Sequence, residues 1–286
     1  MPLGAHLPTS KGFLAALEHA QSLRCDCLQL FSKSPRQWNA SPLDEAKVEA
    51  FREAWSTAGF SSLVIHDSYL INLAAPDPIV LEKSINAMID EVLRAELLGA
   101  DFLVTHCGAF ITKGEEASGV KRLADSLGQV LRATPNVRVK IALENTCGQG
   151  TCLGGPFEHI AQVLETLSTP RLAVCFDTCH AFAFGHELST PAGVENTLQH
   201  FSETIGLQNL AVIHLNDSKG EAGGHLDRHE HIGQGKIGRA GLTHFVNHPA
   251  LQSLPFILET PEVETMIETN LNAVRELRGE KKKSET

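Results

Sequence analysis

The chain has 286 residues, of which 42% are hydrophobic, and a formal net charge of −10. This composition supports a sizeable core and excludes extensive disorder. The chain contains no run of about 18 apolar residues, which a membrane-spanning helix would need. The first residues lack the basic and apolar regions of a signal peptide, and seven cysteines without a framework spacing favour a reduced, cytoplasmic protein. The negative charge disfavours nucleic-acid binding unless positive charge gathers at the site.

Short apolar runs rich in β-branched residues alternate with amphipathic segments along the chain. The runs predict strands over Leu3–Leu7, Cys27–Ser32, Leu63–Asp67, Phe102–Cys107, Lys140–Asn145, Leu172–Cys179, Leu210–Asp217 and Phe256–Thr260. The amphipathic segments predict helices near Gly12–Leu23, Asp44–Ser56, Pro78–Leu98, Ala117–Arg132, Phe157–Leu167, Pro191–Ile205, Gly241–His248 and Glu262–Leu277.

Repeated βα units of this length predict an α/β fold, a single (β/α)₈ (TIM) barrel. A doubly wound open sheet is the alternative, but no G-x-G-x-x-G follows the first strand. Since no linker divides the chain, we expect one catalytic barrel domain over residues 1–278. Residues 279–286, which include Lys281-Lys282-Lys283, are expected to form a short, charged, disordered tail.

Histidines or carboxylates stand at the ends of six successive predicted strands. Two further residues of these types, Asp227 and His229, follow the seventh strand. In a barrel these positions meet at the C-terminal face of the strands, where barrel enzymes carry out their chemistry. The set comprises His66, His106, Glu144, Asp177, His180, His214, Asp227, His229 and Glu259. Each residue alone could be a structural histidine or a helix N-cap. Together, however, the four carboxylates would repel one another unless cations neutralised them.

Mixed imidazole and carboxylate ligands suit Zn²⁺, Mn²⁺ or Fe²⁺. At about three to four ligands per ion, with shared carboxylates, this set could hold two or three ions. Ions about 3.5–4 Å apart are suited to in-line displacement at phosphorus, so the residues favour phosphoryl chemistry. Three divalent ions would add six positive charges at the site, which would allow an acidic protein to bind a phosphodiester.

Several motifs occur in order between residue 4 and Glu259. The longest are His66-Asp67-Ser68-Tyr69-Leu70-Ile71-Asn72-Leu73-Ala74, Asp177-Thr178-Cys179-His180-Ala181-Phe182-Ala183, His214-Leu215-Asn216-Asp217-Ser218-Lys219 and Asp227-Arg228-His229. The shorter ones are Gly4-Ala5-His6, Phe31-Ser32-Lys33, Arg36-Gln37-Trp38, Leu143-Glu144-Asn145-Thr146 and Gly148-Gln149-Gly150. Together they resemble the signatures of endonuclease IV, the apurinic/apyrimidinic (AP) endonuclease family of base excision repair in the xylose-isomerase-like TIM barrel superfamily.

The resemblance implies a barrel with a trinuclear zinc cluster, in which manganese can occupy one or more sites. It implies that His66, His106 and Glu144 hold one ion, and that Glu144 bridges to a second held also by Asp177, His214 and Glu259. It implies a third ion on His180, Asp227 and His229. Arg36 and Tyr69 occupy the positions that family members push into the DNA duplex, although Tyr69 could instead be a rim packing residue.

The implied reaction is hydrolysis of the phosphodiester 5′ to an abasic site in double-stranded DNA, which gives a 3′-hydroxyl and a 5′-deoxyribose phosphate. Trimming of blocked 3′ ends is implied as well, by a monomer acting on nucleoid DNA. Glu144 is the expected group to orient or deprotonate the attacking water. The nearest alternative is a sugar isomerase or epimerase of the related barrels. A second is a DNA-damage binder that does not cut.

Two departures from the family pattern affect the site. His106-Cys107-Gly108-Ala109 stands where the family usually has His-Pro-Gly-Ser, which predicts a looser loop and a soft thiol near the metals. His186 lies where the family often has a tyrosine, and we expect it to support the site or to face DNA rather than to bind metal. The other cysteines, Cys25, Cys27 and Cys175 among them, are expected to be packing residues.

Overall fold

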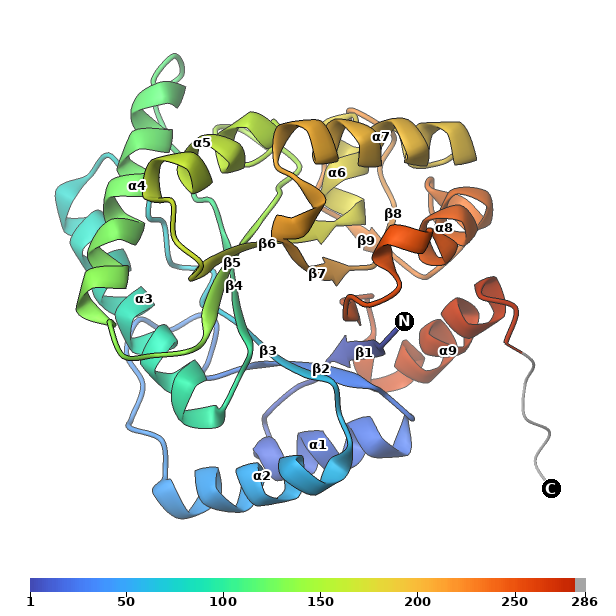
Figure 1. Ribbon diagram of the computed structural model, residues 1–286, viewed down its shortest axis with the longest axis horizontal. Helices are drawn as coiled ribbons and strands as arrows, with labels where there is room; N and C mark the ends of the chain where they lie inside the picture. Colours follow the sequence, from blue (N-terminus) through green and yellow to red (C-terminus); the bar gives the residue numbers. More distant parts are fainter. Residues whose placement is uncertain (281–286) are drawn as a thin grey trace.

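Eight parallel strands close into a barrel in which each strand pairs with its neighbours in the chain (Figure 1). The computed structural model describes residues 1–280. The barrel strands are β1 (Leu3–His6), β2 (Cys27–Phe31), β3 (Ser62–His66), β4 (Phe102–His106), β5 (Lys140–Glu144), β6 (Leu172–Asp177), β7 (Leu210–His214) and β10 (Phe256–Leu258). β1 pairs with both β2 and β10, which closes the ring. The prediction of a single (β/α)₈ barrel is confirmed.

Helices surround the barrel on the outside (Figure 1). They are α1 (Phe13–Ser22), α2 (Glu45–Ala58), α3 (Pro78–Leu98), α4 (Glu116–Ala133), α5 (Phe157–Leu167), α6 (Thr178–Phe184), α7 (Pro191–Thr204), α8 (Gly238–Asn247) and α9 (Val263–Leu277). Two 3₁₀ turns, η1 (Leu207–Asn209) and η2 (Pro249–Leu251), and a small hairpin of β8 (Asp217–Ser218) and β9 (His229–Glu230) complete the described elements.

Alternation along the strands divides the core into two parts. Side chains on one face pack against the helices, whereas the other face fills the barrel with small and β-branched residues. The inner group comprises Cys27, Val64, Val104, Ala142, Ala173, Cys175, Val212 and Ile257. This filled interior leaves the functional groups to the ends of the strands.

Local signals explain where the best-predicted helix begins and ends. The side chain of Asp77 accepts the backbone N–H groups of Ile79 and Val80, and Pro78 occupies the first turn of α3. Gly99 ends the helix in the left-handed region, at φ 79°. These signals are local in sequence, so α3 has the bounds that the pattern predicts.

The strands end one to three residues earlier than the sequence predicts. Strand β6 stops at Asp177 rather than at Cys179, because the Asp177 side chain accepts the His180 N–H and begins α6. Strand β7 stops at His214, and Asp217 pairs instead with Glu230 in the β8–β9 hairpin. Both differences arise where polar side chains bind backbone groups above the barrel.

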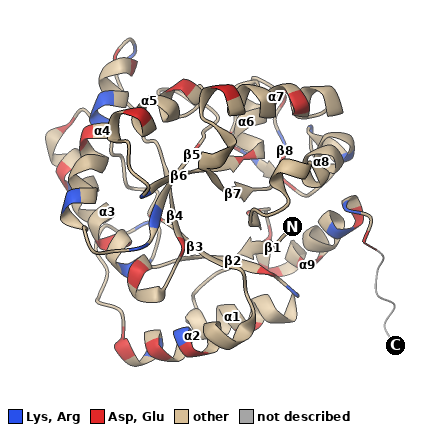
Figure 2. Ribbon diagram, in the orientation of Figure 1, with Lys and Arg blue, Asp and Glu red and all other residues tan. Residues whose placement is uncertain are grey.

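Charges of both signs alternate along outer helices such as α2 and α4 (Figure 2). Over the described residues these helices therefore do not present a uniformly basic face. None of the helices within residues 1–280 is long and apolar enough to cross a bilayer. Of the predicted tail, residues 281–286 lie outside the described part of the chain.

Candidate metal centre

All nine histidines and carboxylates predicted from the strand ends meet at the C-terminal face of the barrel. Their ligand atoms form groups in which all atoms lie within 4.8 Å of one another. Three of these groups are His66, His106 and Glu144; Glu144, Asp177, His214 and Glu259; and His180, Asp227 and His229. The structure thus brings together the same three sets that the sequence resemblance implies.

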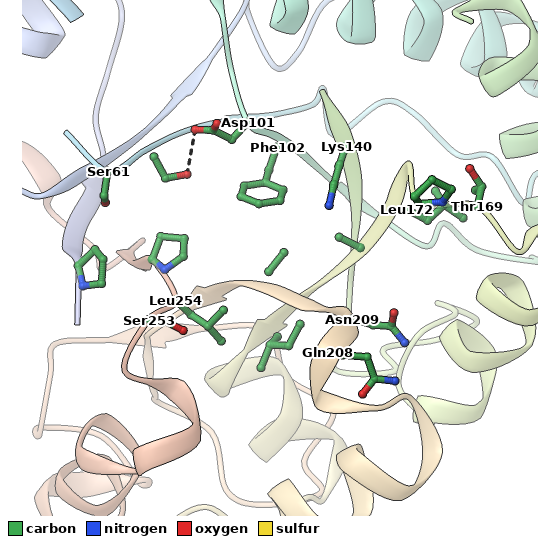
Figure 3. Close-up of a pocket in the computed structure, with 17 residues that line it drawn as sticks. Ser61, Asp101, Phe102, Lys140, Thr169, Leu172, Gln208, Asn209, Ser253 and Leu254 are labelled. Atoms are coloured by element: carbon green, nitrogen blue, oxygen red, sulfur yellow. Dashed lines mark hydrogen bonds between the residues drawn. The ribbon is translucent and has the colours of Figure 1, made fainter. Parts of the chain in front are cut away.

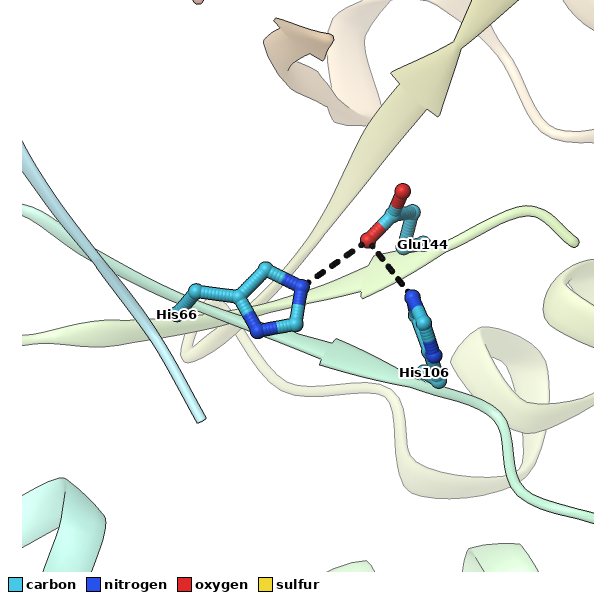
Figure 4. Close-up of side chains that lie close together, drawn as sticks. All are labelled: His66, His106 and Glu144. Carbon is cyan, nitrogen blue, oxygen red and sulfur yellow. Dashed lines mark hydrogen bonds and ion pairs between the residues drawn. The ribbon is translucent and has the colours of Figure 1, made fainter. Parts of the chain in front are cut away.

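Glu144 lies at the centre of this cluster and is fully buried. Its Oε2 atom is 3.4 Å from His66 Nε2 and 3.3 Å from His106 Nε2 (Figure 4). Its Oε1 atom is 3.1 Å from His214 Nδ1 and 3.2 Å from His180 Nδ1. One carboxylate therefore contacts imidazoles from all three sets.

The histidines are held in orientations suited to metal binding. Three of them place Nδ1 against a backbone carbonyl, which can only accept, so Nδ1 carries the hydrogen. These pairs are His66 with Asp67 O (3.0 Å), His180 with Asn145 O (3.0 Å) and His229 with Glu259 O (2.8 Å). In the neutral ring the lone pair is then on Nε2.

Those Nε2 atoms face carboxylates rather than hydrogen-bond donors. His180 Nε2 lies 3.3 Å from Asp227 Oδ1, and His229 Nε2 lies 3.7 Å from both Asp177 and Asp227 oxygens. His229 Nε2 is buried and makes no hydrogen bond. A lone pair that faces a carboxylate is repelled unless a proton or a metal ion lies between them. The donor set and its geometry therefore fit divalent cations.

His214 also directs a nitrogen lone pair at carboxylates, but through Nδ1 rather than Nε2. Its Nε2–H donates to Gln29 Oε1 at 2.8 Å, which leaves the Nδ1 lone pair toward Glu144 and Glu259 (3.2 Å). The Gln29 amide in turn donates to Glu259 at 2.6 Å and to His6 at 2.9 Å. Sequence reasoning missed Gln29 and gave His6 no role. A buried glutamine in the middle of a strand was the signal that could have found Gln29.

The electrostatics of the cluster favour cations. Burial alone would raise the pKa of Glu144, but nearby imidazoles, led by His214 and His106, lower it well below its ordinary value. Burial also opposes protonation of His66, but the Glu144 and Glu259 carboxylates outweigh it and raise its pKa to about 9. The carboxylates thus stay ionised and attract positive charge of either kind, protons or metal ions.

Two asparagines, whose role was also missed from the sequence, hold the segments that carry Asp177 and Glu259 in place. Asn216 Nδ2 donates to Asp177 Oδ2 at 2.7 Å, and its Oδ1 accepts the Glu259 backbone N–H at 2.9 Å. The Asn145 side chain accepts the Asp177 N–H and donates to the Asp177 carbonyl. Asp177 itself is both the N-cap of α6 and a member of the cluster.

Of the two residues expected to contact DNA, Tyr69 lies over the cluster, and Arg36 lies in a loop that is hydrogen-bonded to the segment of Tyr69. Arg36 is exposed in the loop between β2 and α2. The Tyr69 side chain follows β3 and lies over the cluster, with ring centroids 5.7 Å from His66 and 6.4 Å from His106. Tyr69 is 58% exposed, so it is not a buried packing residue.

Cys175 is fully buried among the side chains that fill the barrel, as expected of a packing residue. Cys107 is buried, and its Sγ–H points to the Glu144 carbonyl at 3.5 Å, away from the ligand groups described above. The thiol that lies within reach of Glu144 and His214 is that of Cys175. Because Cys175 is on the inner face of β6, strand alternation turns it toward the cluster.

His186 packs against α5 and belongs to none of the ligand groups described above. Its ring stacks on Phe157, with centroids 4.1 Å apart and an interplanar angle of 1°. Burial lowers its pKa, which keeps the stacked ring neutral.

An open hollow of about 570 Å³ lies at the opposite end of the barrel (Figure 3). It is lined by residues that begin strands, among them Phe102, Lys140 and Leu172. Its ionisable side chains, Asp101 and Lys140, form no cluster comparable to that around Glu144. In barrels this end contributes to stability rather than to catalysis.

Comparisons with known proteins agree with the fold and the site. Residues 17–277 match the model of the xylose isomerase-like TIM barrel family. The chain is 42% identical over 270 residues to the probable endonuclease 4 of Chloroflexus aurantiacus, covering 94% of each chain. It is 40% identical over 279 residues to that of Methanoculleus marisnigri, covering 97% of this chain and 99% of the relative.

Among solved structures, endonuclease IV from Thermus thermophilus superposes with a TM-score of 0.88 at 34% identity, covering 98% of this chain and 100% of that one. A D-tagatose 3-epimerase-like protein superposes with a TM-score of 0.73 at 17% identity, covering 98% and 96%, which shows a shared fold alone. The chain therefore belongs to the endonuclease IV family of nucleases, within the xylose isomerase-like TIM barrels.

Proposed function

We propose that this protein is a metal-dependent AP endonuclease of base excision repair that hydrolyses the phosphodiester 5′ to an abasic site in double-stranded DNA. The products are a 3′-hydroxyl and a 5′-deoxyribose phosphate, and the same site trims blocked 3′ ends. The observation that carries the proposal is the cluster around Glu144, in which histidine lone pairs and carboxylates face a common space. Relatives named endonuclease 4 support it.

The cluster would hold about three Zn²⁺ ions, with Mn²⁺ possible at one or more sites. One set is His66, His106 and Glu144. A second is Glu144, Asp177, His214 and Glu259, and the third is His180, Asp227 and His229. When bound, such ions lower the pKa of the attacking water and stabilise charge that develops around phosphorus.

The residues of the chain supply position and proton transfer. Glu144, which is fully buried at the centre of the cluster, would orient or deprotonate the attacking water. Tyr69 is exposed over the cluster and Arg36 is exposed in the loop between β2 and α2, and both would contact the duplex around the lesion. Turning an abasic nucleotide out of the helix costs the least free energy, because no base has to be unpaired or unstacked. We assign this activity to residues 1–278, acting as a monomer.

Incision of a labelled duplex with one tetrahydrofuran abasic analogue tests the proposal. The analogue cannot undergo β-elimination, so a lyase would leave it intact. We expect a cut on the 5′ side, from a sample in which two to three metals per chain are counted. Binding without cutting by the fully metallated protein would instead indicate a DNA-damage binder. A metallated protein that ignores DNA and interconverts sugars would indicate an isomerase.

A further inference from the structure

Buried polar residues of α3 bind the loop between β2 and α2, which carries Arg36. The loop has no regular structure over residues 32–44, yet its first two residues, Ser32 and Lys33, are only 3% and 8% exposed. Irregular surface loops are usually mobile. The burial of polar residues at the start of this loop therefore needs a physical explanation.

Arg94 of α3 joins the two ends of this loop. Its guanidinium donates from Nη2 to Ser32 O at 2.9 Å, from Nε to Ser32 Oγ at 3.1 Å and from Nη1 to Ser41 O at 3.0 Å. Arg94 is 6% exposed. Only a planar fork of donors can reach both carbonyls at once, which a lysine cannot do.

The middle of the loop is held from the same helix. Lys33 Nζ donates to Asp90 at 2.8 Å and to Trp38 O at 3.4 Å, and it lies 3.6 Å from Glu91. Glu91 is 1% exposed and accepts the Ser32 hydroxyl at 2.6 Å. Burial of these charges costs free energy that apolar packing would not, so the arrangement favours one specific loop conformation over maximal stability.

The loop is also tied to the segment that carries Tyr69. Ser68 Oγ donates to Pro35 O at 2.9 Å, so the neighbours of Arg36 and Tyr69 are hydrogen-bonded to each other. The Tyr69 ring packs edge-on against Phe31, at the end of β2, with centroids 5.5 Å apart. Arg36 and Tyr69 are thus presented from one connected support.

We propose that Arg94, together with Lys33 and Glu91, is a positioning residue that holds the loop over residues 32–41 in the form that meets damaged DNA. This inference rests on the proposed function. Preordering the loop removes an entropic cost that DNA binding would otherwise bear. Loss of the network therefore weakens substrate binding and leaves the metal cluster and the chemical step intact.

The main variant is Arg94→Lys, which keeps the buried charge but not the fork. We expect the KM for the tetrahydrofuran duplex to rise about tenfold, while kcat stays within about twofold and the metal content is unchanged. Trypsin should cleave after Arg36 faster than in the parent protein, as read by mass spectrometry. Asp90→Asn, at a half-exposed position, should act in the same direction to a smaller extent if Arg94→Lys does not fold.

The matched control is Arg138→Lys, because Arg138 is an exposed arginine beside the start of β5, at the other end of the barrel. It should change neither KM nor cleavage after Arg36. In an Arg36→Ala background, Arg94→Lys should add less than about twofold to KM, because the residue it positions is gone.

Unchanged KM and unchanged tryptic cleavage in Arg94→Lys would overturn the inference. Equal losses of kcat and bound metal would also overturn it, since they would indicate a general role in folding. If the parent protein does not cut the duplex, the proposed function fails by itself. The tryptic test then still decides whether the network orders the loop.

Discussion

At the scale of single residues, Glu144 combines complete burial with contacts to four imidazoles. Its side chain is fully buried, and imidazoles from β3, β4, α6 and β7 surround its two carboxylate oxygens. A buried carboxylate is costly unless cations compensate it. Its placement is therefore explained by charge that binds there rather than by packing.

Replacement of Glu144 by glutamine tests this role while keeping the shape of the side chain. We expect incision to fall by about 10²–10⁴-fold, since the base and the shared ligand are both lost. Circular dichroism should report a folded barrel, and metal analysis should report fewer ions per chain. Substantial retained turnover would remove Glu144 from the proposed mechanism.

Tyr69 is an aromatic side chain exposed over the cluster. Tyr69→Ala should weaken binding of the abasic duplex about tenfold, because contacts between an aromatic ring and nucleotides contribute about 1–3 kcal/mol. Metal content should stay the same, and Tyr69→Phe should retain most of the affinity. An unchanged dissociation constant for Tyr69→Ala would return this residue to a packing role at the rim.

At the scale of elements, helix α5 makes contacts that also hold a loop of the site. Helix α5 begins at Phe157, whose ring stacks on His186 after α6. His159 of α5 accepts the Gly154 N–H through Nδ1 at 3.1 Å and lies 2.9 Å from Glu116 of α4 through Nε2. These contacts hold the segment that follows Glu144.

The stacked His186 predicts a pH dependence of stability. Burial lowers its folded-state pKa below 6.5, so the unfolded chain binds the proton more readily. The contribution of His186 to the free energy of unfolding is therefore complete above pH 6.5 and is lost as the pH falls below that value. Urea unfolding of the metal-free protein at about pH 7.5 and about pH 5.5 should show a smaller loss for His186→Phe than for the parent chain. Equal losses of unfolding free energy in the two proteins would contradict a role of His186 in this pH dependence.

At the scale of the whole molecule, closure of the barrel brings residues far apart in sequence to one face. His214 and Gln29 are separated by 185 positions yet share a hydrogen bond inside the barrel. The chain carries ten more acidic than basic residues, and the outer helices mix both signs. Attraction of DNA is therefore expected to depend on cations at the cluster.

Removal of the metals should affect the entire fold. We expect a chelator to abolish incision and to lower the Tm, and added Zn²⁺ to restore both. Each site filled at about 100 times its dissociation constant contributes about 2.7 kcal/mol of stability. Glu144→Gln should show a smaller shift in Tm on chelation, which serves as the control. A chelated protein with the same Tm would show that the cluster does not bind metal under these conditions.

Most of the barrel could be predicted from the sequence, because its causes are local. Apolar runs, caps such as Asp77 and terminators such as Gly99 act within a few residues. The same locality explains why the nine ligand candidates could be found, since each closes a strand or follows one. The surroundings of the Cys107 thiol could not be predicted in this way, because its partner, the Glu144 carbonyl, lies on the neighbouring strand.

The order of the strands and helices, the face on which the polar residues gather and the residue types available there all follow from the sequence. Only the tertiary structure shows that Gln29 selects the nitrogen with which His214 faces the cluster. It also shows that Arg94 holds both ends of the loop that carries Arg36. The physical reason is that hydrogen bonds and charges act over a few ångströms in space, whereas a one-dimensional pattern reports only which face of its own element a residue occupies.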